Sequence, residues 1–203
     1  ALFAKMKKES WSPELIETTA REWIATLPTL EEYHYKRKTN NAKKGDLKTG
    51  EIDAETSKME QLIAAAKLYP KWKNLLEDAG RYEYDDMILW MLDAFKNNES
   101  FKRIVQERYL YVLVDEYQDT NSAQYLLVKL LVGTRGALTA VGDDDQSIYA
   151  WRGARPENLA ELAKDFPSLT VVKLEQNYRS TARILKAANA VIANNPHVFE
   201  KKL

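Results

Sequence analysis

The sequence predicts an α/β fold in which an all-helical part precedes a parallel sheet with helices. In residues 1–108, apolar side chains recur at the three- and four-residue spacing of helices. After residue 109, short apolar runs alternate with helical segments, which is the order expected for βαβ units. The 203 residues are 45% hydrophobic and 30% charged, a composition that suits a soluble globular chain with a buried core.

The clearest helix start is at Ser12, because Ser is a good N-cap and Pro13 fits the first helical position. This helix runs to Pro28. Further helices are expected at about 54–69, ending before Pro70, and at about 71–79 and 84–96.

A polar, basic stretch at residues 36–44 separates the first two of these helices. Its composition predicts a solvated loop. The alternative is a contact between this stretch and duplex DNA.

The later part of the chain is expected to hold three strands. The run at 111–114 is rich in β-branched and aromatic residues, as buried parallel strands are. Similar runs follow at 137–142 and 170–174, and the helices between and after them are expected at 122–132 (closed by Gly133), 156–165 and 180–194.

Composition excludes several classes of protein. Lys plus Arg number 30 and Asp plus Glu number 30, so no global basic field attracts nucleic acid or a membrane surface. The absence of cysteine excludes disulfides, Cys-ligated metal sites and thiol catalysis, and two histidines argue against a histidine-rich metal site. The chain has no apolar run of about 18 residues and no signal-peptide core, so we expect a cytoplasmic protein without membrane contact.

None of the seven glycines is followed by Lys. The chain therefore lacks a phosphate-binding loop of the form G-x-x-x-x-G-K-[ST].

Two acidic residues, Asp115 and Glu116, follow the first strand. Ligands of parallel sheets bind beyond the carboxyl ends of the strands. One carboxylate there can hold Mg²⁺ while its neighbour orients a water molecule. Alternatively, both residues simply begin a surface loop or cap the next helix.

A second acidic cluster, Asp143 to Asp145, follows the second strand and precedes Gln146. The three carboxylates can cap the following turn or lie close to a metal. Gln146 can hydrogen-bond a γ-phosphate or an attacking water, although a lone Gln is more often an inert surface residue.

Aromatic and cationic residues then alternate, with Tyr149 and Trp151 beside Arg152 and Arg155. These are the components of a surface that stacks the bases of a single strand and contacts its phosphates. The alternative is that both rings fill the core under a loop. Arg179, after the third run, can meet a phosphate or pair with a surface acid.

Together these motifs resemble the UvrD/Rep-like superfamily 1 DNA helicases. Residues 113–121 (LVDEYQDTN) resemble motif II, residues 141–154 (VGDDDQSIYAWRGA) motif III and residues 174–180 (LEQNYRS) motif IV. Residues 84–88 and the closing run 184–197 also fit, the latter matching the Rep-like branch especially. The resemblance is close over 84–203 and loose over 1–83.

The resemblance implies an ATP-dependent helicase that moves 3′ to 5′ on single-stranded DNA and acts at junctions with duplex. It implies the following roles: Asp115 holds Mg²⁺ on ATP; Glu116 positions or activates the hydrolytic water; Gln146 senses the γ-phosphate; Tyr178 packs on adenine; Arg179 stabilises the γ-phosphate charge; and Tyr149, Trp151 and Arg152 contact DNA. No protein partner is indicated.

The family's phosphate loop, its N-terminal glutamine motif and most of its second RecA-like domain have no counterpart in the sequence. We therefore expect an internal fragment. Residues 1–83 would form a helical inserted subdomain, and residues 84–203 the later part of a partial RecA-like domain with the start of the crossing to the second. Alone, this chain is expected to be inactive.

One competing hypothesis is a non-hydrolysing module that binds single-stranded DNA or docks on a partner. A second is a helicase–nuclease of the same superfamily, whose nuclease domain would lie beyond this chain.

Overall fold

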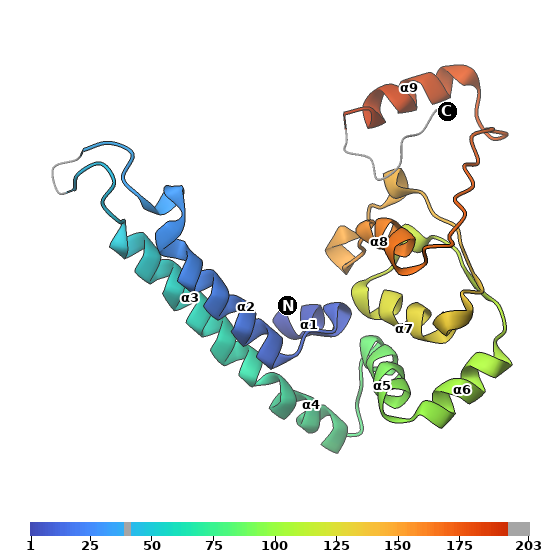
Figure 1. The fold of residues 1–203 in the computed structure, drawn as a ribbon, viewed down its shortest axis with the longest axis horizontal. Coiled ribbons are helices and arrows are strands. Elements are labelled where there is room, and N and C mark those ends of the chain that lie inside the picture. The colour runs from blue at the N-terminus through green and yellow to red at the C-terminus, as the bar shows by residue number, and fades with distance from the viewer. Residues whose placement is uncertain (39–41, 195–203) are drawn as a thin grey trace. The chain divides into compact units, whose positions relative to one another are not determined.

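The computed structural model describes residues 1–38 and 42–194. The chain divides into two compact units, Ala1–Tyr84 and Asp85–Leu203, and each is described by itself. The elements of both are labelled in Figure 1.

The first unit is helical. Its helices are α1 (Leu2–Glu9), α2 (Pro13–Thr26), α3 (Thr49–Lys67) and α4 (Tyr69–Asp78), with short 3₁₀ turns at Leu27–Thr29 and Glu31–Tyr33. The long helices α2 and α3 pack side by side (Figure 1). Met6, Ile16 and Ala66 form a buried cluster that joins α1, α2 and α3.

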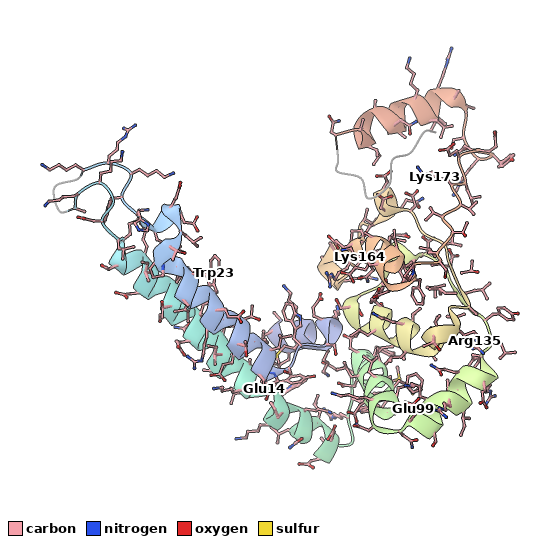
Figure 2. The ribbon with its side chains drawn as sticks, viewed as in Figure 1. Glu14, Trp23, Glu99, Arg135, Lys164 and Lys173 are labelled. Atoms are coloured by element: carbon pink, nitrogen blue, oxygen red, sulfur yellow. The ribbon has the colours of Figure 1, made fainter. Side chains whose placement is uncertain are left out.

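The predicted start of α2 is confirmed, because the Ser12 side chain accepts a hydrogen bond from the Leu15 amide at 3.2 Å. Figure 2 shows Glu14 in the first turn of this helix. The prediction that a helix ends before Pro70 is correct, but Pro70 also lies in the first turn of α4, where its missing N–H costs nothing. Helix α3 begins earlier than predicted, at Thr49.

The basic stretch lies between α2 and α3. Its described residues, 36–38 and 42–44, form a loop as predicted, while residues 39–41 lie outside the described part of the chain. Backbone bonds fix the base of the loop, since the Tyr35 amide donates to Asp46 at 3.0 Å and His34 bridges to Leu47.

The second unit contains a small parallel sheet. Helices α5 (Tyr84–Asn97) and α6 (Glu99–Arg108) precede β1 (Val112–Val114), and α7 (Ser122–Val132) connects β1 to β2 (Leu138–Ala140). The strands pair in register, with Val112 opposite Leu138 and Val114 opposite Ala140. These findings confirm the first two predicted strands and the helix between them.

Helix α8 (Glu157–Asp165) follows β2 after two short 3₁₀ turns, and α9 (Ala182–Ile192) is the last described helix. Both were predicted within two residues. Between β1 and α8 lie 3₁₀ turns at Tyr117–Asp119, Gly133–Arg135, Asp144–Gln146 and Ala150–Arg152.

One face of the sheet is covered. Its side chains Val114, Leu138 and Ala140 pack on a buried cluster formed by Tyr117, Tyr125, Leu159 and Leu162. On the other face, Leu113 is 75% exposed. The flanking residues Tyr111 and Val141 are 77% and 51% exposed.

The predicted third strand at 170–174 is wrong. Residues 170–177 adopt no regular structure, and Val172 and Leu174 are 73% and 82% exposed. Figure 2 shows Lys173 on this segment between α8 and α9. The apolar run has high β-propensity, but a strand also needs a partner ladder and a surface to pack on, and no described strand supplies them here.

Candidate functional site

The turn after β1 places two carboxylates at the end of the sheet. Asp115 and Glu116 are both exposed, and Glu116 has a left-handed backbone with φ 48° and ψ 44°. The Glu116 amide donates to Asp115 Oδ1 at 2.9 Å. A left-handed non-glycine residue costs about 1–3 kcal/mol, and such residues cluster at functional sites.

The loop after β2 lies against this turn. The Val141 amide donates to the Val114 carbonyl at 2.8 Å, and the Tyr117 amide donates to the Val141 carbonyl at 2.9 Å. These two bonds continue the sheet beyond its strands. The structure therefore places the turn that follows β1 against the acidic loop that follows β2.

The second acidic cluster forms a compact turn. One carboxylate oxygen from each of Asp143, Asp144 and Asp145 lies within 4.8 Å of the others. Gln146 Nε2 donates to Asp143 Oδ2 at 2.7 Å, and the Asp145 amide donates to Asp143 Oδ1 at 3.2 Å. Asp143 thus caps the turn, which is the first of the two predicted alternatives.

The aromatic residues of the same loop gather around one arginine. The Tyr149 and Trp151 ring centroids are 6.3 Å apart, and the Arg152 guanidinium carbon lies 5.0 Å from the first and 4.5 Å from the second. Trp151 is 74% exposed and Tyr149 37%. The alternative that these rings fill the core is therefore wrong for Trp151.

Backbone bonds hold this surface in a tight turn. The Arg152 and Ala154 amides both donate to the Tyr149 carbonyl, at 2.8 and 3.2 Å, and Gly153 has φ 94°. Ala154 is buried. The turn is thus anchored by the buried Ala154, while the Trp151 ring is exposed to solvent.

Tyr178 and Arg179 stand apart from these groups in the described structure. Tyr178 is 92% exposed, Arg179 is exposed, and no described hydrogen bond, ion pair or ring contact joins either to Asp115, Glu116 or Gln146. The Asn177 side chain accepts from the Arg179 amide at 2.9 Å and orders the local turn.

A network beneath the site joins α7 to α8. The Tyr125 hydroxyl donates to Asp165 Oδ2, and Lys129 Nζ lies 2.7 Å from Asp165 Oδ1. The bond from Lys129 is the main cause of a lowered pKa of Asp165, and the bond from Tyr125 lowers this pKa further. Burial raises the pKa of Tyr125, with a further contribution from its bond to Asp165, and burial also raises the pKa of Tyr117.

The donor set fits a hard divalent cation. Asp115 offers exposed carboxylate oxygens, and oxygen ligands with room for water are what Mg²⁺ prefers.

Two residues of the turn were not singled out from the sequence. Gln118 is 1% exposed, and Asp119 carries a buried Oδ1 with no hydrogen-bond partner among the described residues. Both lie in the segment 113–121, so the motif itself was the signal that pointed to them.

Most of the chain matches a known protein family. The model of the UvrD/REP helicase N-terminal domain matches residues 2–167. The chain belongs to this family. The family match includes Asp115, Glu116, Gln146 and the Tyr149–Trp151–Arg152 surface, whereas Tyr178 and Arg179 lie beyond it.

Individual UvrD/REP helicases are similar to the chain. It is 54% identical over 160 residues to the ATP-dependent DNA helicase Rep of Escherichia coli, covering 79% of this chain and 24% of that protein. It is 44% identical over 137 residues to DNA helicase II of Escherichia coli, covering 68% and 19%. The match to DNA helicase II of Haemophilus influenzae is 40% over 164 residues, covering 81% and 22%.

The chain thus spans about a quarter or less of the length of these relatives. In the described residues, no helix has the length and apolar character needed to cross a membrane.

Proposed function

We propose that this chain contributes part of the motor of an ATP-dependent DNA helicase, which moves 3′ to 5′ on single-stranded DNA and separates duplex at junctions. One observation carries the proposal. The turn that holds Asp115 and Glu116 is hydrogen-bonded to the loop that presents Tyr149 and Trp151, so carboxylates suited to hydrolysis and rings suited to bases share one scaffold.

The nucleotide side of the site divides its roles among a few residues. Asp115 would hold Mg²⁺, which when bound neutralises charge on the phosphate oxygens. Glu116 would accept the proton of the attacking water. Gln146 would hydrogen-bond the γ-phosphate, and its bond to Asp143 fixes its resting orientation.

The remaining nucleotide roles fall to Tyr178, against the adenine, and Arg179, on the γ-phosphate charge. In the described structure both are exposed and belong to the segment before α9. Their function requires that this segment lie beside the Asp115–Glu116 turn when ATP is bound.

The nucleic-acid side is the Tyr149–Trp151–Arg152 surface. Exposed rings provide stacking faces for bases of any sequence, and the guanidinium provides charge for phosphate. The Arg152 guanidinium lies over both rings and so keeps a positive charge beside the proposed stacking faces.

We further propose that residues 1–83 correspond to the helical inserted subdomain and residues 84–203 to the later part of the first RecA-like domain; the division of the chain into units at Tyr84 and Asp85 supports this proposal. The sequence supplies no G-x-x-x-x-G-K-[ST] loop, whose amides and Lys cradle the phosphates. The isolated chain should accordingly bind ATP weakly and hydrolyse none.

The full-length protein tests this proposal through its DNA-stimulated ATP hydrolysis. Glu116→Gln keeps the size of the side chain but removes its capacity to accept a proton, so kcat should fall about 10²- to 10⁴-fold. Steady-state phosphate release with and without oligo-dT is the measurement. A Glu107→Gln variant, altered at an exposed position on α6, is the matched control.

A second candidate function is a non-hydrolysing module for single-stranded DNA. The exposure of Trp151 favours it, because that surface needs no nucleotide to form. If oligo-dT binds while the full-length wild-type protein hydrolyses no ATP, this second function replaces the first.

A further inference from the structure

Gln118 lies at the centre of the site without being one of its exposed groups. It is 1% exposed and follows Glu116 in the 3₁₀ turn Tyr117–Asp119. Its Nε2 donates to Glu116 Oε2 at 2.8 Å, and its Oε1 accepts from the Asp143 amide at 3.0 Å. The side-chain amide of Gln118 therefore joins the acidic turn after β1 to the acidic loop after β2.

Chemistry fixes the orientation of this amide. A backbone N–H only donates, so the atom facing Asp143 must be the oxygen of Gln118. The nitrogen then faces Glu116 Oε2, which accepts its hydrogen bond. Gln is thus suited to the position, because Glu offers no donor there and a hydrocarbon side chain offers neither group.

The neighbouring glycine leaves room for this contact. A Cβ added at Gly142 would lie 2.8 Å from Gln118 Oε1 and 3.3 Å from the Gln118 amide nitrogen. Any side chain at residue 142 would push the Gln118 amide out of place. Gly142 and Gln118 therefore form one close-packed unit.

The contacts of Gln118 continue into the loop after β2. Asp143, which donates to Gln118, accepts from Gln146 through its own carboxylate. The Ser147 hydroxyl donates to the Gln118 carbonyl at 3.3 Å. A continuous set of hydrogen bonds thus runs from Glu116 through Gln118 and Asp143 to Gln146.

The far end of the same loop is also tied to this turn. The Arg155 amide and the Asn158 side chain both donate to the Thr120 carbonyl, each at 3.0 Å. The Tyr149–Trp151–Arg152 surface lies between these two attachments. A shift of the turn after β1 would therefore reach both ends of that surface.

We propose that Gln118 is a positioning residue for ATP hydrolysis, which holds the Glu116 carboxylate and links it to the loop that carries Tyr149 and Trp151. This inference rests on the proposed function. Gln118 itself contacts neither nucleotide nor DNA; it acts through Glu116 and Asp143.

Two variants of the full-length protein test the two hydrogen bonds of the Gln118 side chain separately. Gln118→Glu is nearly isosteric and still accepts from the Asp143 amide, but it places an oxygen against Glu116. Gln118→Leu removes both contacts. In both variants the DNA-stimulated kcat should fall about 10- to 100-fold, the effect of a displaced catalytic group, while KM for ATP stays within about twofold.

Amide hydrogen exchange distinguishes the variants further. The Asp143 amide should lose its protection in Gln118→Leu and keep it in Gln118→Glu. The ratio of DNA-stimulated to basal hydrolysis should fall more in Gln118→Leu, because only that variant breaks the link to the loop.

Gln106 offers a matched control in the same unit. Its Nε2 donates to the Leu130 carbonyl at 2.6 Å and lies 2.7 Å from a Cβ built on Gly133, so it too is a glutamine packed against a glycine. Gln106→Leu should lower thermal stability but leave kcat and the stimulation ratio of the folded protein unchanged. Gly142→Ala should reproduce the kcat loss by displacing the Gln118 amide without substituting Gln118 itself, and it decides the matter if the Gln118 variants do not fold.

The outcomes are separable. Wild-type kcat in Gln118→Glu and Gly142→Ala overturns the inference, and so does an equal loss in Gln106→Leu, which would make the effect structural. If the wild-type protein hydrolyses no ATP, the proposed function fails and this inference fails with it. Normal wild-type hydrolysis with unaffected variants overturns this inference alone.

Discussion

At the scale of single residues, Trp151 is the side chain whose exposure most needs an explanation. A large ring that is 74% exposed loses hydrophobic stabilisation unless something covers it, and Arg152 covers only part of it. A base of single-stranded DNA has the right shape and size to cover the rest. The exposure of Trp151 therefore supports the proposed DNA-binding surface.

Trp151→Ala should weaken binding of oligo-dT to this chain by about 1–3 kcal/mol, because one base of the oligonucleotide loses the indole ring on which it stacks. Fluorescence anisotropy of a labelled oligonucleotide measures the change. Trp23→Ala is the matched control, since Trp23 is a 39% exposed ring on α2 in the first unit (Figure 2). Equal affinities for wild type and Trp151→Ala would rule out stacking at this surface.

Sequence reasoning reached some of these residues and missed others for a physical reason. Asp115, Glu116 and Trp151 have types and positions that stand out in a strand-end loop. Gln118 does not, because a polar residue in a short loop carries no periodic signal of burial. Its burial comes from the loop after β2, and only the tertiary structure brings that loop against it.

At the scale of elements, helices with explicit caps were the most predictable. Ser12 marks the start of α2, and Asn121 starts α7 with a complete capping box in which Asn121 and Gln124 exchange hydrogen bonds. These signals are local, so the sequence contains them. The wrong strand prediction at 170–174 has the opposite cause. A strand forms only when a second segment pairs with it, and the local sequence at 170–174 does not show whether such a partner exists.

The link between α7 and α8 should depend on pH. The folded state lowers the pKa of Asp165 below its value in the unfolded chain, because Lys129 and Tyr125 bond to the carboxylate. The resulting stabilisation is present above about pH 4, near the unfolded value, and is lost as pH falls through the folded value. Acid should therefore loosen the contact between the two helices.

Asp165→Asn should cost about 1–2 kcal/mol of unfolding free energy at pH 7, as hydrogen bonds to a charged group do. The difference from wild type should shrink as pH is lowered from 5 to 3. Urea denaturation followed by circular dichroism at each pH measures it, with Glu157→Gln, an exposed acid on the same helix, as control. A difference that is independent of pH would contradict this account.

At the scale of the whole molecule, charge is balanced, with 30 basic and 30 acidic residues. The proposed attraction to DNA must therefore come from local groups, and stacking should contribute more than phosphate contacts. Binding of that kind depends weakly on salt, because few counterions are released.

The logarithm of the oligo-dT binding constant should fall with the logarithm of salt concentration with a slope of about −1. Arg152→Ala should make the slope shallower by about 0.7, the contribution of one phosphate on a single strand. Titrations at several salt concentrations provide the measurement, and the double change Lys43→Ala and Lys44→Ala serves as control.

The same titration resolves the role of the basic stretch 36–44. A slope steeper than about −3 on a junction substrate, but not on oligo-dT, would show that this stretch contacts duplex DNA. A steep slope on oligo-dT would contradict the local surface around Arg152.

The open face of the sheet has a consequence for work with the folded chain in solution. Leu113, Tyr111 and Val141 give the native molecule an apolar surface of the kind that dyes such as ANS bind. Dye fluorescence usually signals a molten globule, but here it would rise without any loss of packing. Near-ultraviolet circular dichroism of the buried Tyr117 and Tyr125 rings will report on folding of this unit more faithfully than dye binding.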